Sequence, residues 1–372
     1  MGTRGHRLRH VIVTLLLTAA TTASARPVDV VVCLDTSRSM EGLIDSARSR
    51  LWDIVTTLSK VEPRPELRVG LLSYGSPTGS SEEDGWVIVR TDLTSDLDHV
   101  YAQLMGLATD GGDELVGRVV HEAVNTMSWA PDPEGLRLVF VAGNESADQG
   151  VDTYDFRAAT ELGRRADVVV NAIFVGSRDI AVTSHWDELA RAGRGSFSSI
   201  DPELGRIQVE TPQDEALLTL NASLNETYLP YGPDGAAGLA NQTAQDGNAT
   251  RLGVQSCSSR IVAKGTALYT NASWDLVDAL QEDGFQWASL TDDDLPPALR
   301  GMSIEAREAH VAALRERRES IQEKIQDLSN EREEFLRAEL KRRQLAQPGL
   351  DDALRDALLA QARKKGFNTD GC

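Results

Sequence analysis

The 372-residue sequence has few basic residues and no apolar run long enough to cross a membrane. Lysine and arginine total 38 against 57 aspartates and glutamates, so the formal net charge is −19. A chain of this charge repels nucleic acid and anionic lipid, and neither is expected as a partner. The apolar stretch Val11–Ala20 is far shorter than the roughly 20 residues that a membrane-spanning helix needs. Stable membrane insertion of the mature chain is therefore not expected.

Cysteine and histidine are also scarce. Three cysteines leave at least one thiol without a disulfide partner. Cys33 lies in an apolar run and is expected to be a buried thiol, whereas pairing of Cys257 with Cys372 is left open. The six histidines are scattered, and neither His121 nor His185 has the spacing of a metal ligand. With no nucleophile-and-base arrangement and no glycine-rich phosphate loop, the protein is not expected to be an enzyme.

Residues 1–25 have the pattern of an export signal. Arg4, Arg7 and Arg9 form a positive segment ahead of the apolar stretch. Ala23-Ser24-Ala25 then matches a small-residue cleavage site. A short membrane anchor is the alternative. We expect cleavage after Ala25 and a periplasmic or secreted mature protein.

A buried strand followed by a polar turn stands at the start of the mature chain. Val28–Leu34 is almost entirely apolar, and Asp35, Ser37 and Ser39 follow it before a helical pattern begins. In open α/β sheets, ligands bind where a strand ends and a helix follows. Alternate residues of such a turn point the same way, so these three side chains are expected to converge. One carboxylate and two hydroxyls are hard oxygen ligands, which favour Mg²⁺, with Mn²⁺ or Ca²⁺ as alternatives.

Apolar strands alternate with helical patterns as far as Tyr228. This alternation predicts a parallel sheet covered on both faces, so the expected fold class is α/β with a doubly wound, mostly parallel sheet. The strands expected after the first are Leu67–Tyr74, Trp86–Val89, Leu136–Ala142, Val168–Val175 and Phe197–Ile200. The first two of these are expected to form a hairpin at the edge of the sheet.

The string Asp35-Thr36-Ser37-Arg38-Ser39 after a buried strand resembles the metal-ion-dependent adhesion site (MIDAS) of von Willebrand factor type A (VWA) domains. The pattern L-A-x-x-G-x-G-x-F-x-x-I at Leu189–Ile200 is similar to the end of the same domain. The resemblance covers about residues 28–228 and is to exported bacterial members with a helical C-terminal extension. It implies a Rossmann-like VWA domain at 26–228, in which Asp35, Ser37 and Ser39 hold the cation.

The resemblance implies two further loops around the cation, and here the sequence departs from the family. The second loop supplies a threonine in the family. Thr109 is one candidate, while alignment of the Gly111-Gly112 step points to Asp113. The third loop carries an aspartate after the fourth strand, but this chain has Ala142-Gly143-Asn144 there, with Glu145 or Asn144 as the substitute.

A dication held by one or two carboxylates and neutral hydroxyls attracts a further anionic oxygen. The expected function is therefore an exported, metal-dependent, adhesion-type protein-binding module that engages a carboxylate of a partner protein. One alternative is an accessory or assembly factor of a cell-envelope complex, with the VWA domain as a scaffold. A hydrolase is a remote alternative, because Ser37 stands where phosphotransfer would need a second carboxylate. The structural alternative is a metal-free loop whose serines cap the next helix.

Beyond the α/β pattern, the sequence predicts a helical or linker region at 229–300 and a helical extension at 301–372. Gly232–Gly253 is expected to be a loose linker or a weak helix. One long helix is expected from Ser303, as its N-cap, to about Ala346.

Heptad positions of this long helix, counted from Val311, are apolar except for Arg318 and Arg332. They indicate either a coiled-coil homodimer through 303–346 or an antiparallel hairpin with a second helix at Leu350–Lys365. The hairpin is favoured, because two arginines in the seam disfavour a tight dimer.

Overall fold

A six-stranded sheet forms the centre of the first part of the chain in a computed structural model, which describes residues 25–150, 152–200, 209–342 and 350–371. The leader residues 1–24, the turn expected at 347–349 and Cys372 lie outside the described residues. The strands are β1 (Arg26–Asp35), β2 (Pro65–Tyr74), β3 (Ile88–Thr94), β4 (Leu136–Gly143), β5 (Val168–Val175) and β6 (Arg194–Ile200).

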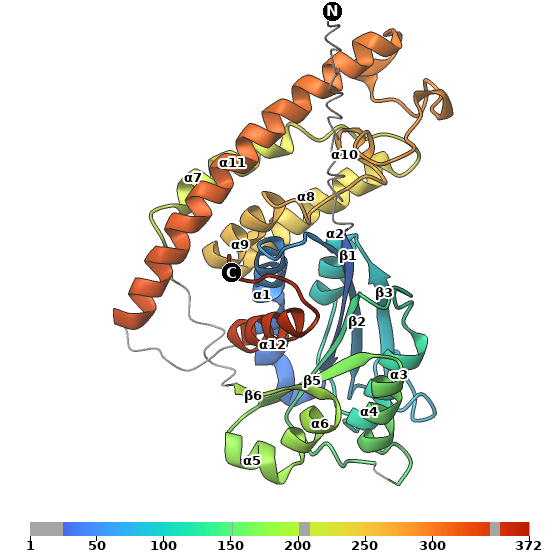
Figure 1. The fold of residues 1–372 in the computed structure, drawn as a ribbon, viewed down its shortest axis with the longest axis vertical. Coiled ribbons are helices and arrows are strands. Elements are labelled where there is room, and N and C mark those ends of the chain that lie inside the picture. The colour runs from blue at the N-terminus through green and yellow to red at the C-terminus, as the bar shows by residue number, and fades with distance from the viewer. Residues whose placement is uncertain (1–24, 151, 201–208, 343–349, 372) are drawn as a thin grey trace, which may run out of the picture.

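The strand order is β3-β2-β1-β4-β5-β6 (Figure 1). All neighbouring pairs are parallel except β2 and β3, which form the antiparallel pair expected at the sheet edge. From β1 the chain first builds toward β3 and then crosses back to β4 and beyond. The loops that follow β1 and β4 therefore leave the sheet in opposite directions, and open α/β sheets bind ligands at such a point, beyond the carboxyl ends of the strands. The predicted fold class is confirmed.

Helices cover both faces of the sheet, because alternate strand residues point to opposite sides. In β1, Val30 and Leu34 belong to one buried cluster, and Val31 and Cys33 belong to the other. Cys33 is a buried free thiol, as predicted. The helices on the first face are α1 (Glu41–Ser59), α2 (Leu97–Met105) and α12 (Leu350–Lys364), and those on the second are α3 (Val116–Thr126), α4 (Phe156–Arg165) and α6 (Trp186–Ala192), with the short α5 (Arg178–Thr183) before α6.

The helix α12 lies on the sheet, although it comes from the far end of the chain. It packs against α1 and the strands β4, β5 and β6. Leu354 and Leu358 join the buried cluster that contains Phe140 and Ile173. In the described part of the chain, the apolar face of α12 is thus used against the sheet, and the hairpin predicted with the preceding long helix is wrong.

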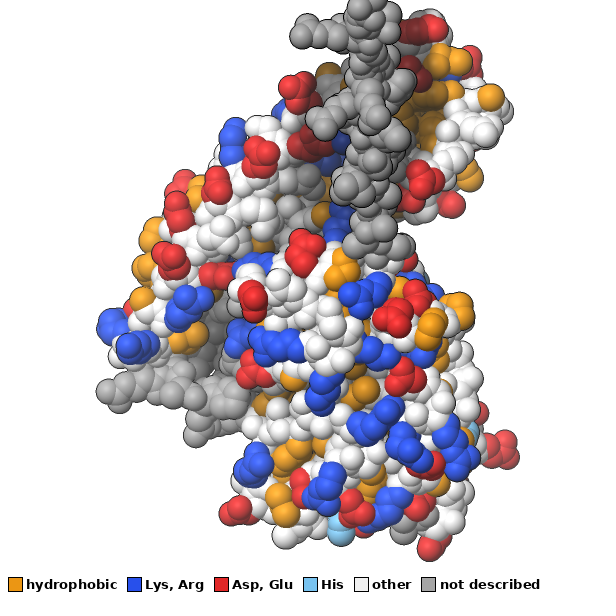
Figure 2. All heavy atoms as spheres, viewed as in Figure 1, with side chains coloured by type: hydrophobic (Ala, Val, Ile, Leu, Met, Phe, Trp, Pro, Cys, Tyr) orange, Lys and Arg blue, Asp and Glu red, His pale blue; other side chains and the backbone are white. Residues whose placement is uncertain are grey.

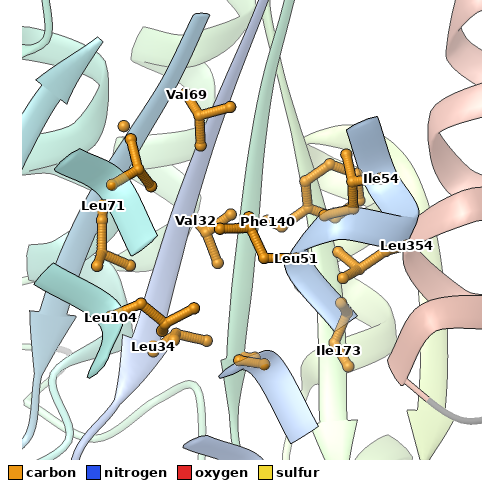
Figure 3. Close-up of a pocket in the computed structure, with 14 residues that line it drawn as sticks. Val32, Leu34, Leu51, Ile54, Val69, Leu71, Leu104, Phe140, Ile173 and Leu354 are labelled. Atoms are coloured by element: carbon orange, nitrogen blue, oxygen red, sulfur yellow. The ribbon is translucent and has the colours of Figure 1, made fainter. Parts of the chain in front are cut away.

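A small cavity lies between the sheet and α1, α2 and α12. Its volume is about 30 Å³, and its lining side chains, including Leu51, Phe140 and Leu354, are apolar (Figure 3). A cavity of this size and lining stays dry or holds at most a water molecule or two. It marks imperfect packing under α12 and is no ligand site.

Leu358→Ala tests whether α12 is part of this core. Leu358 is fully buried, so the substitution is expected to lower the free energy of unfolding by at least about 2 kcal/mol, as measured by urea denaturation. Leu340→Ala is the matched control, because Leu340 is 39% exposed and should change stability little. Equal, small effects of both substitutions would show that α12 does not belong to the core.

The helices that come between β6 and α12 in the sequence form a second layer beside α1 (Figure 1). They are α7 (Asp214–Asn225), α8 (Gly235–Leu252), α9 (Val254–Lys264), α10 (Leu276–Ala279) and α11 (Ile304–Arg342), with 3-10 turns at Trp287–Ser289 and Pro297–Leu299. The segment expected as a linker or weak helix forms α8, and the sequence analysis missed α9. Both pack onto the α/β layer, α9 along α1 and α8 on α2. The ranges 26–228, 229–300 and 301–372 remain predictions as independent domains.

The long helix α11 spans 39 residues and begins where predicted, since Ser303 Oγ accepts a hydrogen bond from the Ala306 N–H at 3.3 Å. Its predicted seam packs inside the chain. Ile321 and Ile325 are buried against α7 and α9. Figure 2 shows acidic and basic side chains interspersed along the visible face of α11. Of the helices that the structure describes, this one included, none combines the length and apolarity needed to cross a membrane.

The two arginines of the seam pair with carboxylates of the same chain. Arg318 Nη1 lies 2.6 Å from Asp275 Oδ2 and 2.7 Å from Asp278 Oδ1. Arg332 Nε lies 3.3 Å from Asp214 Oδ1. All of these side chains are largely buried. The polar breaks in the heptad pattern therefore match acidic positions on the helices that α11 covers.

Candidate cation site

The polar turn after β1 is held between two neighbouring segments at the carboxyl edge of the sheet. The Thr36 N–H donates to Tyr74 O at 2.8 Å, which continues the pairing of β1 with β2. On the other side, the Asp110 N–H donates to Thr36 O at 3.0 Å, and Ser37 and Asp110 form an isolated parallel bridge. Because backbone bonds fix both sides of the turn, the side chains of its alternate residues have defined directions.

Asp35, the last residue of β1, is fully buried. Its Oδ1 accepts a hydrogen bond from the Ser37 N–H at 2.7 Å. Its Oδ2 is buried and has no hydrogen-bond partner in the described part of the chain. Burial raises the pKa of Asp35 to about 7; the hydrogen bonds from Ser37 oppose this shift, and the charges of Glu114 and Glu145 add to it. An unpaired buried carboxylate oxygen of this kind favours a bound cation or a proton.

Two glycines let the neighbouring backbone approach this carboxylate closely. A Cβ atom on Gly75 would lie 2.9 Å from Asp35 Oδ1, and one on Gly143 would lie 3.2 Å from Asp35 Oδ2. Gly143 also faces Tyr74, whose Oη would be 2.4 Å from such a Cβ. Any side chain at either position would therefore crowd the carboxylate.

The two serines of the turn lie together, as the sequence predicts. Ser37 Oγ and Ser39 Oγ are 3.2 Å apart, with Ser37 buried and Ser39 exposed. Ser37 precedes the 3-10 turn η1 (Arg38–Met40), but its side chain caps no backbone N–H there. The hydroxyls are therefore not used in the capping role that the metal-free alternative assigns to them.

The second predicted loop reaches the site through a different residue. Thr109 and Asp113 make no hydrogen bond to Asp35, Ser37 or Ser39 among the contacts of the described residues, and Asp113 is exposed. The neighbouring Glu114 is half-buried. Its Cγ would lie 3.0 Å from a Cβ on Gly75, the same point that lies 2.9 Å from Asp35 Oδ1.

The pKa of Glu114 is shifted in the same direction as that of Asp35, for similar reasons. Burial raises the pKa of Glu114, hydrogen bonds including those from Gln149 and Ser37 oppose the shift, and the charge of Glu145 adds to it. The sequence alone did not predict this residue, because the family alignment places Asp113 at the matching position. The path of the loop decides which of the two neighbouring acids points inward.

The third loop places Asn144 and Glu145 at different distances from the turn. Asn144 Nδ2 donates to Ser39 Oγ at 3.1 Å. Glu145 is exposed, but its charge acts on Asp35 and Glu114. The backbone of this loop is fixed by Trp186, whose Nε1 donates to Glu145 O at 2.7 Å. Asn144 therefore contacts Ser39, and Glu145 adds negative charge.

The donor set suits a hard cation and not a soft one. Within the ranges that the structure describes, no three His, Cys, Asp or Glu side chains form a metal cage by themselves. The candidate site depends instead on Asp35 with the hydroxyls of Ser37 and Ser39. All of these donors are oxygens, which suits Mg²⁺, Mn²⁺ or Ca²⁺.

No protein-family model and no curated protein matches this sequence. Solved structures to which it is similar include proximal thread matrix protein 1 from the mussel byssus with a zinc-occupied MIDAS motif, at 15% identity over 48% of this chain and 43% of that chain, with a TM-score of 0.36. A von Willebrand factor type A protein from Catenulispora acidiphila is similar at 15% identity over 49% and 40%, with a TM-score of 0.36. The SpRpn10 VWA domain is similar at 15% identity over 52% and 94%, with a TM-score of 0.35.

This chain thus spans less than half the length of the first two proteins. VWA domains are among the solved structures that the chain is similar to, and its own sheet has the doubly wound α/β fold that the sequence predicted.

Proposed function

We propose that the chain is a divalent-cation-dependent protein-binding module, with Asp35, Ser37 and Ser39 as cation ligands. The observation that carries this proposal is Asp35 Oδ2, a buried carboxylate oxygen without a hydrogen-bond partner among the described residues. A buried, uncompensated charge is costly, and a cation at this position removes the cost. The glycines at 75 and 143 let the backbone of two neighbouring strand ends approach the carboxylate closely, without a side chain that would crowd it.

The chain's own residues leave one side of the site accessible. Ser37 is buried and Ser39 is exposed, so the ion would be bound from the sheet side and would face solvent beyond Ser39. When bound, Mg²⁺ supplies an open coordination position for an oxygen from outside. The proposed partner is a protein that presents a carboxylate there. The leader at 1–25 supports an exported, periplasmic or secreted location.

We propose binding and not catalysis at this site. The Ser37 and Ser39 hydroxyls contact each other, and Ser39 also contacts the Asn144 amide, which holds both oxygens together as a pair of ligands. A homodimer through 303–346 would have to use the outer face of α11, because Ile321, Ile325 and the two seam arginines already pack inside the chain.

Isothermal titration calorimetry of the purified, chelator-treated protein tests cation binding. We expect heat on titration with Mg²⁺, Mn²⁺ or Ca²⁺, and an affinity at least about tenfold lower for Ser37→Ala, because a ligand oxygen is lost. Ser289→Ala is the control, since Ser289 is exposed on a distant 3-10 turn. No heat with any of the three cations would refute the proposed function.

A further inference from the structure

Glu114 occupies the position beside Asp35 that the sequence assigned to Thr109 or Asp113. The backbone of its loop is fixed, because the Glu114 N–H donates to Gln149 Oε1 at 2.6 Å and the Val116 N–H donates to Glu114 O at 3.0 Å. The Glu114 side chain and Asp35 Oδ1 both approach the bare Cα side of Gly75. The Glu114 side chain therefore lies on the Oδ1 side of Asp35, and its carboxylate accepts a hydrogen bond from the Ser37 side chain.

We propose that Glu114 supplies a second carboxylate to the cation held by Asp35, Ser37 and Ser39. This inference rests on the proposed function, because it assigns a further ligand to the same ion. With two carboxylates of the chain beside it, a dication would be close to charge-balanced before any partner arrives.

Charge repulsion in the site supports this assignment. The carboxylates of Asp35, Glu114 and Glu145 all repel one another. Glu145 is exposed, so water screens its charge, whereas Asp35 is buried and Glu114 is half-buried. A half-buried carboxylate beside a buried one is unfavourable when both are charged, and a cation between them removes this cost without protonating either group.

A second carboxylate has opposite effects on the binding of the cation and on the binding of the partner's carboxylate. It increases the affinity for the cation, since the affinity of such sites rises with ligand charge. It also weakens the attraction between the bound ion and an outside carboxylate, and it fills a position that water or the partner would otherwise take. Glu114 would then be an internal competitor of the partner's carboxylate.

Mn²⁺ is the probe that separates these effects, because the relaxation rate of water protons reports how many exchangeable waters remain on the bound ion. For Glu114→Gln we expect Mn²⁺ affinity to fall at least about tenfold. We also expect each bound Mn²⁺ to relax water more strongly than in the wild type, and added acetate to reverse more of this relaxation. Glu114→Asp keeps the charge but retracts the carboxylate, so it should also lose affinity.

Asp113→Asn is the matched control, since it removes the same charge from the adjacent exposed residue and should leave Mn²⁺ affinity and relaxation unchanged. The inference is overturned if Glu114→Gln matches the wild type in both measurements, or if Asp113→Asn weakens binding as much as Glu114→Gln. In either case, Mn²⁺ binding by the wild type that is lost in Ser37→Ala would still support the proposed function. Absence of Mn²⁺ binding by the wild type would overturn both.

Discussion

Replacing Asp246 by asparagine is expected to lower the free energy of unfolding by about 3–5 kcal/mol, because it leaves buried cations without their counter-ion. Asp246 lies on α8 and faces two basic residues of α9. Arg260 Nε is 2.6 Å from Asp246 Oδ1, and Lys264 Nζ is 2.9 Å from Asp246 Oδ2. The side chains of Arg260 and Lys264 are 1% and 0% exposed. Only one other carboxylate, Asp98 at 2.7 Å from Arg260 Nη1, forms an ion pair with them in the described part of the chain.

This loss is measurable by urea denaturation at neutral pH, with Asp293→Asn as the control. Asp293 is exposed, so removal of its charge should have no measurable effect. Adding Lys264→Met to Asp246→Asn removes the excess cation and should restore most of the lost stability. A cost below about 1 kcal/mol for Asp246→Asn would show that the buried ion pairs contribute little.

The same carboxylate predicts a pH dependence. Burial by itself raises the pKa of Asp246, but the charges of Lys264 and Arg260 outweigh it and hold the pKa well below the ordinary value of 3.8. A carboxyl with a depressed folded-state pKa contributes stability that is complete above its ordinary pKa and is lost as the pH falls below it. The difference in stability between wild type and Asp246→Asn should therefore narrow below pH 3.8.

Asp35→Asn is expected to abolish the cation-induced increase in melting temperature and to stabilise the cation-free protein. A cation at 100 times its Kd would stabilise the wild type by about 2.7 kcal/mol, and the variant should show no such increase. Without cation, the variant loses a buried charge whose Oδ2 has no partner in the described part of the chain. The buried amide limits this gain, which we expect to be about 1–2 kcal/mol at pH 8.

The pKa of Asp35 determines the pH range in which Asp35→Asn stabilises the cation-free protein. The folded-state pKa is raised from 3.8 to about 7, so the charge of Asp35 costs stability progressively as the pH rises through this range and costs most above it. Thermal unfolding of chelator-treated wild type and Asp35→Asn should differ most at pH 8 and little at pH 4. An equal effect of saturating Mg²⁺ on both proteins would contradict the assignment of Asp35 as a ligand.

Local order along the chain made much of the fold and part of the site predictable. β1, β2, β4 and β5 were found because each contains a short apolar run, and an apolar run beside helical patterns indicates burial on both faces. The strand predicted at Trp86–Val89 lies at Ile88–Thr94, because its more polar sequence gives no clear boundary. Asp35, Ser37 and Ser39 could be placed together because they share one turn, so their directions depend on a few backbone angles only. The N-cap at Ser303 was predictable for the same reason.

Residues far apart in the sequence were harder to bring together. The apolar face of α12 was recognised, but the pattern says only that the face is buried and not what covers it. The heptad seam of α11 was recognised as well, and its true partners are α7, α9 and the carboxylates of Asp214, Asp275 and Asp278. The helix α9 was missed because its sequence is largely polar, and its basic residues are buried through ion pairs with α2 and α8 that no local pattern indicates.

The sequence by itself determined the strands, the polar turn after β1 and the chemistry of its ligands, because these depend on neighbours along the chain. The tertiary structure alone decided that α12 covers the sheet, that the seam of α11 packs inside the chain, and that Glu114 rather than Asp113 lies beside Asp35. Each of these depends on which distant surface meets a given face, and that choice follows from the packing and charge balance of the whole molecule.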